Sequence, residues 1–462
     1  MPQTSVNNYS LRQPLSQYKK ATFVHMAEQN KNQEAILNKL GITALNAMQE
    51  AAYKAITSNA EVVLLSPTGT GKTLAFLLPI ITALDSELEE VQVMILVPSR
   101  ELAIQIEQVV REMGSGYKIN AVYGGVSGSK DKLELKHAPA ILIGTPGRVA
   151  DHIRRKNIST RHIKTVVLDE YDKSLEVGFS NEMSEIIEAL PNLEKKVLTS
   201  ATQKVKVPGF VGIRDAKHLN FLKDTELQLQ LKLVISPYED KLETLVDLLQ
   251  HIGPKNGIVF CNFKDSIERI SDHLYSKRID HVCFYGGLEQ IDRERALIKF
   301  RNGTHRLLIA TDLAARGIDV PELDFIVHYQ LPPRPDEFVH RNGRTARMNT
   351  EGTAYVLKWE KEMLPVFIKG AEPTALSRNK QGLTKDWETL YISGGRKDKI
   401  SKGDIAGLFF KQGNLNSDEL GMIELKSDCA FVSVPCSKSA ALVKQLNNSR
   451  LKKKKVRISL LD

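Results

Sequence analysis

Short apolar runs alternate with helical segments in two successive stretches of the chain, and this alternation limits the possible folds more than any other feature. The runs of the first stretch are VVLLSP (62–67), VQVMILVP (91–98), AILIGTP (140–146), KTVVLDE (164–170) and KKVLTSA (195–201). Those of the second are GIVFCN (257–262), HVCFYG (281–286), RLLIATD (306–312), FIVHYQ (325–330) and GTAYVLKW (352–359). Continuous apolar runs are typical of parallel strands that are buried on both faces. The sequence therefore predicts two parallel α/β sheets in tandem.

Breaks in the alternation predict the domain boundaries. A polar stretch near 210–228 separates the two α/β units, and a second break lies near 371–396. The remainder has the order helix, strand, strand, helix, strand, which suits a small α+β domain with its helices on one face of a sheet. We thus predict a flexible N-terminal segment (1–20), two α/β domains (21–212 and 225–371), a linker (372–395) and a third domain (396–462).

Lysine and arginine are concentrated near the end of the chain. The net charge of the 462 residues is +9, and residues 391–462 contribute +7 of it, with 14 Lys and Arg against 7 Asp and Glu. A basic terminal domain indicates a nucleic acid or an acidic membrane surface as its partner, with a solubility tail as the bland alternative.

Several classes of protein are excluded at this point. No apolar run reaches about 18 residues, so no transmembrane helix is expected. The N-terminal sequence MPQTSVNNYSLRQPLSQYKK lacks the apolar core of a signal peptide. The four cysteines include no CxxC pair, so they predict no metal site and suit a reducing compartment. We expect a cytoplasmic protein.

A glycine-rich loop between the first predicted strand and a helical run indicates a phosphate site. The loop is SPTGTGKT (66–73), whose backbone N–H groups and helix N-terminus can cradle phosphate oxygens. Lys72 is expected to bind the β- and γ-phosphates, and the Thr73 hydroxyl to bind Mg²⁺. A glycine-rich turn with a solvated lysine is the alternative. The residues expected to hold the nucleotide are Ser66, Thr68, Gly69, Thr70, Gly71, Lys72 and Thr73.

Two carboxylates follow a strand of the same predicted sheet. Asp169 and Glu170 end the run VVLDE, where the sheet of a P-loop protein places its metal partner. Asp169 is expected to hold Mg²⁺, and Glu170 to orient and deprotonate the attacking water. An acidic turn at the end of a strand is the alternative for this motif taken alone.

A cluster of arginines lies in the second α/β unit. The segment HRNGRTAR (340–347) carries three arginines within seven residues, which could form a solvated helix face. If the second unit packs against the first, these guanidinium groups can instead neutralise charge that develops on the γ-phosphate. The sequence therefore predicts ATP hydrolysis in a cleft between two domains, gated by their closure.

Together these motifs resemble those of the DEAD-box RNA helicases of superfamily 2, over about residues 25–370. Further motifs follow in the family's order: Ia (98–103), GG (124–125), Ib (145–148), III (200–202), IV (258–262), QxxR (290–293) and V (310–319). The resemblance implies an α/β fold of two RecA-like parallel-sheet P-loop domains in tandem. The sequence departs from the family at Tyr171, where the family has Ala, and at Ala346, where it has Gly.

The resemblance also assigns roles to single residues. Phe23 and Gln49 resemble the Q motif, in which the aromatic ring stacks on adenine and the amide reads the base edge. Asp319 is expected to hold the ribose, and Arg344 and Arg347 to act as arginine fingers beside the catalytic Lys72, Asp169 and Glu170. The residues expected to grip the RNA backbone in the two α/β domains are Pro98, Arg100, Gly124, Gly125, Thr145, Pro146, Gly147, Arg148, Arg293 and Thr311.

The third domain is similar to the RNA-binding domain of the DbpA group of this family, an RRM-like α+β fold. Its aromatic residues are sparse, and Phe431 is expected to be core, so we predict phosphate contacts instead of base stacking. The residues expected to make them are Lys452, Lys453, Lys454, Lys455 and Arg457. A solvated lysine run is the alternative.

The predicted function is that of a monomeric ATP- and Mg²⁺-dependent RNA helicase, an RNA-stimulated ATPase that locally unwinds structured RNA. The resemblance of the third domain implies a hairpin of large-subunit (23S) ribosomal RNA and the pre-ribosomal large subunit as partners, and a role in ribosome assembly. The alternatives are a remodeller of messenger RNA in cold stress or decay, and a non-hydrolysing RNA-binding scaffold. A DNA helicase is a distant fourth.

Overall fold

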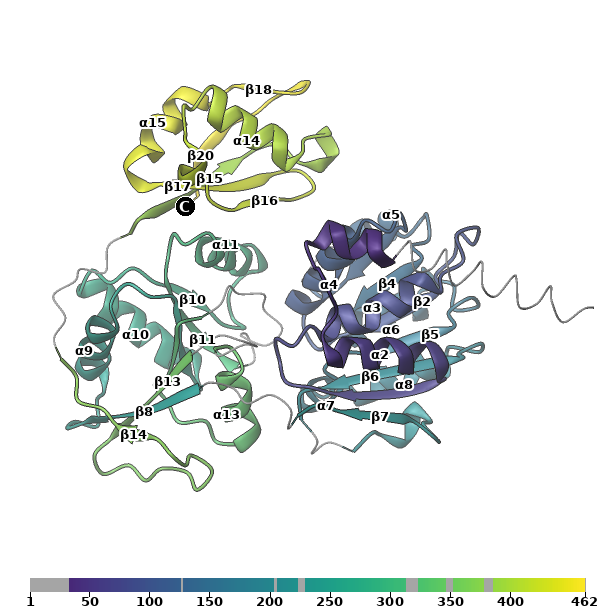
Figure 1. Ribbon diagram of the computed structural model, residues 1–462, viewed down its shortest axis with the longest axis horizontal. Coiled ribbons are helices and arrows are strands. Elements are labelled where there is room, and N and C mark those ends of the chain that lie inside the picture. Colours follow the sequence, from purple (N-terminus) through teal and green to yellow (C-terminus); the bar gives the residue numbers. More distant parts are fainter. Residues whose placement is uncertain are drawn as a thin grey trace, which may run out of the picture.

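The computed structural model describes residues 33–125, 128–202, 206–222, 229–312, 323–345, 352–377 and 385–461 of the 462-residue chain. Three domains are present, and both α/β domains predicted from the sequence are confirmed (Figure 1). The two α/β domains lie side by side, and the third domain lies against the second. No helix of the described residues is long and apolar enough to cross a membrane.

The first domain is a seven-stranded parallel sheet in the order β3-β4-β2-β5-β6-β1-β7. Its strands are β1 (Glu61–Leu65), β2 (Val93–Leu96), β3 (Ile119–Val122), β4 (Ile141–Gly144), β5 (Thr165–Leu168), β6 (Lys195–Ser200) and β7 (Lys217–Asn220). Its helices are α2 (Ala47–Ser58), α3 (Lys72–Thr82), α4 (Arg100–Met113), α5 (Gly128–Glu134), α6 (Pro146–Arg154), α7 (Tyr171–Glu176) and α8 (Ser180–Glu188).

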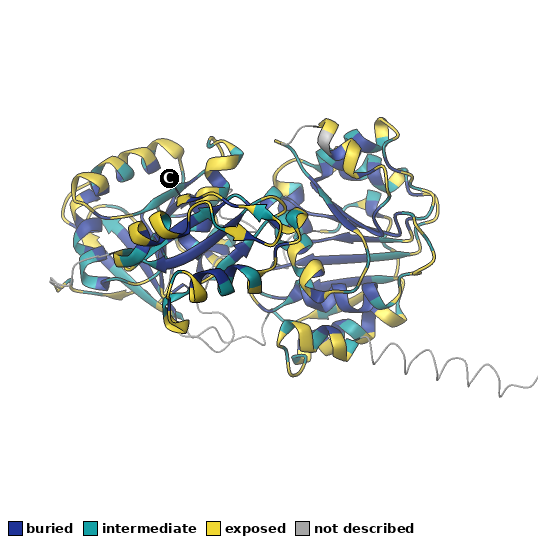
Figure 2. Ribbon diagram, turned by 90° about the horizontal axis from the view of Figure 1, so that it is seen from above, coloured by how far each residue is buried: buried dark blue, intermediate teal, exposed yellow. Residues whose placement is uncertain are grey.

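Each face of this sheet carries its own hydrophobic core, because successive side chains of a strand point to opposite faces. Val62 and Leu64 of β1 join a cluster with α2, α3 and α4, whereas Val63 and Leu65 join a second cluster with α6 and α8. Figure 2 shows these buried strands between helices whose outer faces are exposed. This double burial explains the continuous apolar runs in the sequence.

The second domain repeats the architecture, with a seven-stranded parallel sheet in the order β10-β11-β9-β12-β13-β8-β14. Its strands are β8 (Leu229–Ser236), β9 (Gly257–Cys261), β10 (Val282–Phe284), β11 (Leu307–Thr311), β12 (Phe325–His328), β13 (Gly352–Trp359) and β14 (Glu372–Pro373). The helices described here are α9 (Leu242–Ile252), α10 (Lys264–Ser276), α11 (Gln290–Arg301) and α13 (Pro335–Asn342).

The third domain is a four-stranded antiparallel sheet in the order β16-β17-β15-β20, with two helices on one face. Its elements are β15 (Trp387–Ile392), α14 (Lys402–Lys411), β16 (Ile423–Leu425), β17 (Ala430–Pro435), α15 (Cys436–Leu446) and β20 (Ile458–Leu460), with a small hairpin of β18 (Arg450–Leu451) and β19 (Lys454–Lys455). This arrangement confirms the predicted small α+β domain.

Two predicted boundaries differ from the structure. Strand β7 pairs with β1, so the first domain extends beyond residue 212. Strand β15 lies at the centre of the third sheet, so the predicted linker over 372–395 is wrong at its end and the third domain begins before residue 396. The run WETLYI shows no clean alternation of apolar and polar residues, so a period of two cannot be recognised in it.

The third domain docks on the second through the outer face of its sheet. The guanidinium of Arg301, at the end of α11, donates to both carboxylate oxygens of Glu424 on β16, at 2.7 and 2.8 Å from Nη2. The Ser433 hydroxyl donates to the Asn302 carbonyl oxygen at 2.7 Å. Because Glu424 is buried, this bidentate pair ties α11 firmly to the third domain.

Candidate nucleotide site and RNA surface

The glycine-rich loop forms the expected turn between β1 and α3. The ammonium of Lys72 is buried, and it donates hydrogen bonds of 2.7 Å to the carbonyl oxygens of Ser66 and Pro67. Burial lowers the pKa of Lys72, and the nearby carboxylates of Glu170 and Asp169 oppose that shift. The Ser66 hydroxyl lies 2.8 Å from the hydroxyl of Thr70, so the serine that replaces glycine fits inside the loop.

Helix α2 is attached to this loop through its N-terminal cap. Asn46 and Gln49 form a reciprocal capping box, and the Asn46 amide also donates to the Thr70 carbonyl at 3.1 Å. The Gln49 amide donates to the Gly71 carbonyl at 3.4 Å, and a Cβ on Gly71 would lie 2.4 Å from Gln49 Nε2. The predicted position of Gln49 beside the loop is therefore observed, whereas Phe23 lies outside the described residues.

The two carboxylates at the end of β5 face the loop from the neighbouring part of the sheet. The Thr199 hydroxyl, on β6, donates to the Asp169 carboxylate and accepts from the Glu170 backbone N–H at 3.2 Å. Burial raises the pKa of both carboxyl groups, and Lys72 opposes the shift in each. Glu170 has a φ of 48°, a left-handed backbone that a glutamate rarely adopts. No pattern in the sequence indicates Thr199, which directly precedes the predicted Ser200–Thr202 motif.

Tyr171 finds its place in the second core of the first domain. The ring is buried with Leu168 and Met183, and burial raises its pKa to about 12. On its other side, Asp172 accepts a hydrogen bond of 2.9 Å from the Thr202 hydroxyl. The bulky residue therefore leaves the hydrogen bond between Thr202 and the neighbouring Asp172 in place.

The second domain brings its arginine segment against the loop. The Thr68 hydroxyl donates to the Gly343 carbonyl at 3.0 Å across the interface between the two α/β domains. A Cβ on Gly343 would lie 2.3 Å from Thr68 Oγ1, so the close approach requires glycine. Arg344 is buried near Glu170 and opposes the rise of its pKa. Arg347 and Asp319 lie outside the described residues.

Arg341 has a different place from the one expected for the arginine segment. Its side chain is fully buried and donates to both oxygens of Asp312, to Asn262 Oδ1 and to the Gln330 carbonyl. The alternative of a solvated helix face is therefore wrong for Arg341. Its hydrogen bonds connect several segments inside the second domain.

Four charged side chains connect α7 with the start of α13 across the domain interface. Lys173 is 3% exposed, and its Nζ lies 2.8 Å from Glu176 Oε1 on its own helix and 3.4 Å from Asp336 Oδ2 on α13. In return, Arg334 Nη2 lies 3.5 Å from Glu176 Oε2. The helix that follows Asp169 and Glu170 is thereby paired with the helix that precedes Arg344.

The predicted RNA-gripping residues of the first domain lie at the carboxyl ends of its strands. Pro98 and Arg100 follow β2, Gly124 and Gly125 follow β3, and the Thr145–Arg148 segment follows β4. A Cβ on Gly125 would lie 2.5 Å from the Arg100 guanidinium, so the two motifs touch. Carboxyl ends of parallel strands share one edge of the sheet, where ligands of such folds bind. Thr311 ends β11 in the same way in the second domain.

Arg293, which the sequence assigned to the RNA surface, lies at the interface between the two α/β domains. Its Nη2 lies 2.9 Å from Glu101 Oε1 of the first domain, and the two side chains are only 10% and 7% exposed. Nearby, Arg100 donates to Gln290 Oε1 at 3.1 Å. We therefore assign Arg293 to the closure of the two domains. Our sequence reasoning missed its partner Glu101, although the glutamate stands inside motif Ia.

Arg148 is held by a buried carboxylate. Its Nε donates to Asp131 Oδ2 at 2.9 Å, and His152 Nε2 lies 3.2 Å from the same oxygen. Asp131 on α5 thus fixes the orientation of the arginine at the start of α6.

The predicted lysines of the third domain surround the β18–β19 hairpin. Lys452 and Lys454 form ion pairs with Asp404 and Asp398 at 2.9 and 2.8 Å. Lys453, Lys455 and Arg457 are exposed on the same part of the surface. The basic surface of this domain therefore lies away from the sheet face that docks on the second domain.

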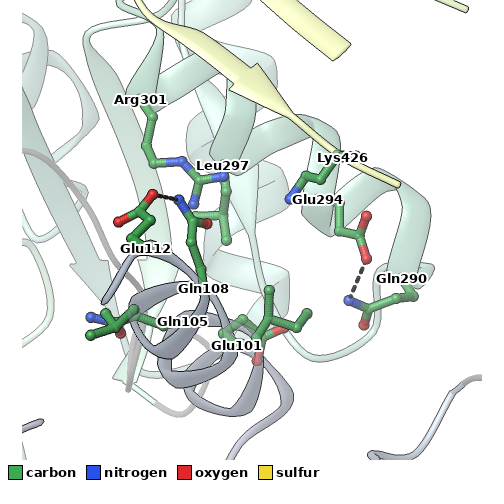
Figure 3. A pocket seen from close by; sticks show the side chains of 11 residues that line it. Glu101, Gln105, Gln108, Glu112, Gln290, Glu294, Leu297, Arg301 and Lys426 are labelled. Carbon is green, nitrogen blue, oxygen red and sulfur yellow. Dashed lines mark hydrogen bonds between the residues drawn. The ribbon is translucent and has the colours of Figure 1, made fainter. Parts of the chain in front are cut away.

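All three domains meet at one pocket (Figure 3). Helix α4 contributes Gln108 and Glu112, α11 contributes Glu294 and Arg301, and Lys426 reaches in from the third domain. The three carboxylates of this lining outnumber its two cations, so its charge does not favour phosphate and we do not assign RNA to it. The pocket shows instead that α4 and α11 face each other when the domains are closed.

Protonation of His328 should destabilise the fold in mild acid. Burial lowers the pKa of His328 to about 3 from its ordinary 6.5. Between these two pH values the unfolded chain binds a proton at His328 and the folded chain does not. As the pH is lowered from about 6 to about 4, the contribution of His328 should reduce the free energy of unfolding by about 1.4 kcal/mol per pH unit. Denaturant unfolding of His328→Gln should lack that slope, whereas His218→Gln on the exposed β7 should keep it; equal slopes in both variants would contradict the assignment.

Comparison with known proteins gives three family matches in chain order. Residues 46–208 match the DEAD/DEAH box helicase family, 240–349 the helicase conserved C-terminal domain, and 389–460 the DbpA RNA binding domain. The chain is similar to the ATP-dependent RNA helicase DbpA of Escherichia coli (strain K12), with 32% identity over 92% of this chain and 96% of the relative. It is similar to DbpA of Bacillus subtilis (strain 168), with 29% identity over the same shares. Among solved structures, S. cerevisiae Dbp5 bound to RNA and ADP BeF3 matches with a TM-score of 0.64 and 28% identity, over 71% of this chain and 88% of that one.

Proposed function

The chain belongs to the DEAD-box ATP-dependent RNA helicases of the DbpA group, and from this premise we propose that it hydrolyses ATP between its two α/β domains in order to remodel large-subunit ribosomal RNA. One observation carries the first half of the proposal: the Thr68–Gly343 contact brings the second domain to the glycine-rich loop, with Arg344 beside Glu170. Catalytic groups of two domains meet only through this closure.

The residues present fit ATP with Mg²⁺. Thr73 and Asp169 supply a hydroxyl and a carboxylate, the hard oxygen ligands that Mg²⁺ prefers. A divalent cation there would also offset the like charges of Asp169 and Glu170, which raise each other's energy in a buried site. When bound, the metal neutralises charge on the transferred phosphoryl group.

The chain's own groups would divide the work as follows. Lys72 leaves the loop carbonyls to bind phosphate oxygens, Glu170 orients water and takes its proton, and Arg344 neutralises negative charge from the other domain. Thr199 keeps Asp169 in place. Closure also aligns the strand-end residues of both sheets, so that the RNA grip depends on the nucleotide.

The third domain supports the choice of ribosomal RNA as the substrate. It matches the DbpA RNA binding domain and exposes Lys453, Lys455 and Arg457 on one surface. Phosphate contacts of this kind bind any RNA, so the shape of the hairpin must select the target. We include a pre-ribosomal large subunit as partner, a monomeric state, and a cytoplasmic location that suits the four free cysteines.

The test is the ATPase rate of the full chain with intact ribosomal RNA, its fragments, unrelated messenger RNA and single-stranded DNA. We expect the largest stimulation with large-subunit ribosomal RNA, and loss of that preference in Lys453→Glu/Lys455→Glu. The matched control Lys411→Glu/Lys444→Glu changes exposed lysines on the two helices of the same domain. Equal stimulation by messenger RNA would favour the remodeller of messenger RNA, and no ATPase with any RNA would favour the scaffold.

A further inference from the structure

The outer face of the third sheet carries three aromatic residues, and the second domain covers its centre. Trp387 and Tyr391 lie on β15, and Phe431 lies opposite Tyr391 on β17, with ring centroids 5.8 Å apart. Phe431 packs against Ile298 of α11. In the middle of the face, the Thr389 hydroxyl lies 2.7 Å from the hydroxyl of Thr304 in the second domain. Bases therefore cannot stack on the centre of this sheet.

Trp387 lies at one end of the covered face, where the two domains separate. Its indole is partly exposed and lies between two glycines, one from each domain. A Cβ on Gly303 would lie 3.8 Å from the indole Cδ1, and one on Gly421 would lie 3.2 Å from Cζ3. Since these glycines carry no side chains, the indole remains partly open to solvent. The expectation of sparse aromatics missed Trp387 and Tyr391, because both stand in the predicted linker.

The indole lines a hollow of about 490 Å³ between the second and third domains. That volume lies within the range of sites for small organic groups, about 300–1,000 Å³. Charged side chains line the hollow: Lys255 is exposed, Arg306 forms an ion pair with Asp386, and Asp324 belongs to the same lining. The exposed ammonium of Lys255 near an aromatic ring suits a planar ligand that carries a negative charge.

An amide without partners adds a second, independent sign of a ligand. Asn302 is 5% exposed and lines the same hollow, and within the described residues neither its Oδ1 nor its Nδ2 has a hydrogen-bond partner. Leaving a buried polar atom unpaired costs about 1–3 kcal/mol, so such groups are rare without a reason. The donor and acceptor of an amide match the edge of a nucleobase.

We propose that this hollow binds one unpaired nucleotide of RNA, at a site composed of both domains. The base stacks on Trp387, its edge approaches the Asn302 amide, and Lys255 pairs with the phosphate. Aromatic stacking combined with cationic phosphate contacts is how proteins bind unpaired RNA. The inference rests on the RNA-dependent function proposed above, and it adds a contact that exists only while the third domain is docked.

The chain contains two tryptophans, Trp359 and Trp387, so indole fluorescence can test the site in the full-length protein. In Trp359→Phe, Trp387 is the only reporter, and a single-stranded RNA oligonucleotide should quench its emission with the midpoint of RNA binding. In Trp387→Phe, Trp359 reports from β13 of the second domain and should show no quenching. Anisotropy of labelled RNA measures binding independently in both variants. Equal quenching in both, or none in Trp359→Phe at RNA saturation, would overturn the proposal.

Affinity gives a second test. Trp387→Leu should bind the oligonucleotide on the order of 10-fold more weakly, whereas Trp387→Phe keeps an aromatic face and most of the affinity. Lys255→Ala should lower the salt dependence of binding by about one ion, and the control Lys411→Ala should not. Unchanged affinity in Trp387→Leu and Lys255→Ala would refute the site. RNA-stimulated ATPase of the unmodified chain separates the failures: its absence defeats the proposed function, whereas its presence without these effects defeats only this inference.

Discussion

Glu170→Gln should lower kcat for ATP about 10²- to 10⁴-fold, the usual contribution of a general base. Glutamine keeps the shape of the side chain but cannot take a proton from water. Thr199, Lys72 and the Thr68–Gly343 contact are untouched, so the two domains should still close. We therefore expect the variant to bind RNA in the presence of ATP and to release it slowly. Steady-state ATPase rates and ATP-dependent RNA binding measure the two effects separately.

The matched control for this prediction is Glu188→Gln, the same chemical change on the exposed end of α8 in the same domain. That variant should retain the full ATPase rate. An active Glu170→Gln would show that another group activates the water. Loss of ATP-dependent RNA binding together with hydrolysis would show that Glu170 also holds the domains closed.

Arg293→Met should uncouple RNA from ATP hydrolysis. Breaking a buried ion pair costs about 3–5 kcal/mol because it leaves the other charge without a partner. Glu101 would be that charge, and only in the closed state, since the pair joins two domains. The closed state should become at least about 100-fold less populated. The affinity for ATP at the open first domain should change little, whereas the RNA-stimulated rate should collapse.

A double-mutant cycle distinguishes this pair from a simple loss of folding. Glu101→Gln/Arg293→Met removes both charges, so it should recover part of the rate that Arg293→Met loses. The distance between fluorophores on the two α/β domains, with RNA and a non-hydrolysable ATP analogue, reports closure directly. Additive effects of the single changes would contradict a direct interaction. A normal RNA-stimulated rate in Arg293→Met would contradict a role in domain closure and would favour the predicted RNA contact of Arg293.

The two large sheets could be predicted because the burial of each strand is visible in its own short stretch of sequence. Strands such as β5 and β9 are buried on both faces, so each is a continuous apolar run. The glycine-rich loop and the carboxylates Asp169 and Glu170 were equally visible, since phosphate and metal chemistry restricts the residue types. What the structure adds is their meeting with Gly343 and Arg344, which depends on packing between domains.

The missed features share a different cause. Strand β15 has one face in the core and one against the second domain, and only Leu390 and Ile392 of its six residues are aliphatic. Arg293 carries the charge that an RNA contact needs, and only the approach of Glu101 reveals its other use. Thr199 is an ordinary strand residue in the sequence, and only the structure shows its hydroxyl between the Asp169 carboxylate and the Glu170 backbone N–H. Such pairings join residues far apart in sequence, so no local pattern contains them.

The charges between α7 and α13 bear on how the enzyme resets after each turnover. Lys173 keeps Glu176 as a partner on its own domain, and Arg334 keeps Glu337, 2.8 Å away, on the other. When the domains part, each of the two cations therefore keeps a carboxylate partner on its own domain. The two cross-domain contacts can therefore form and break while the pair within each domain stays intact. Domain closure in this helicase is then easily reversed, which suits an enzyme that must release its product after each turnover.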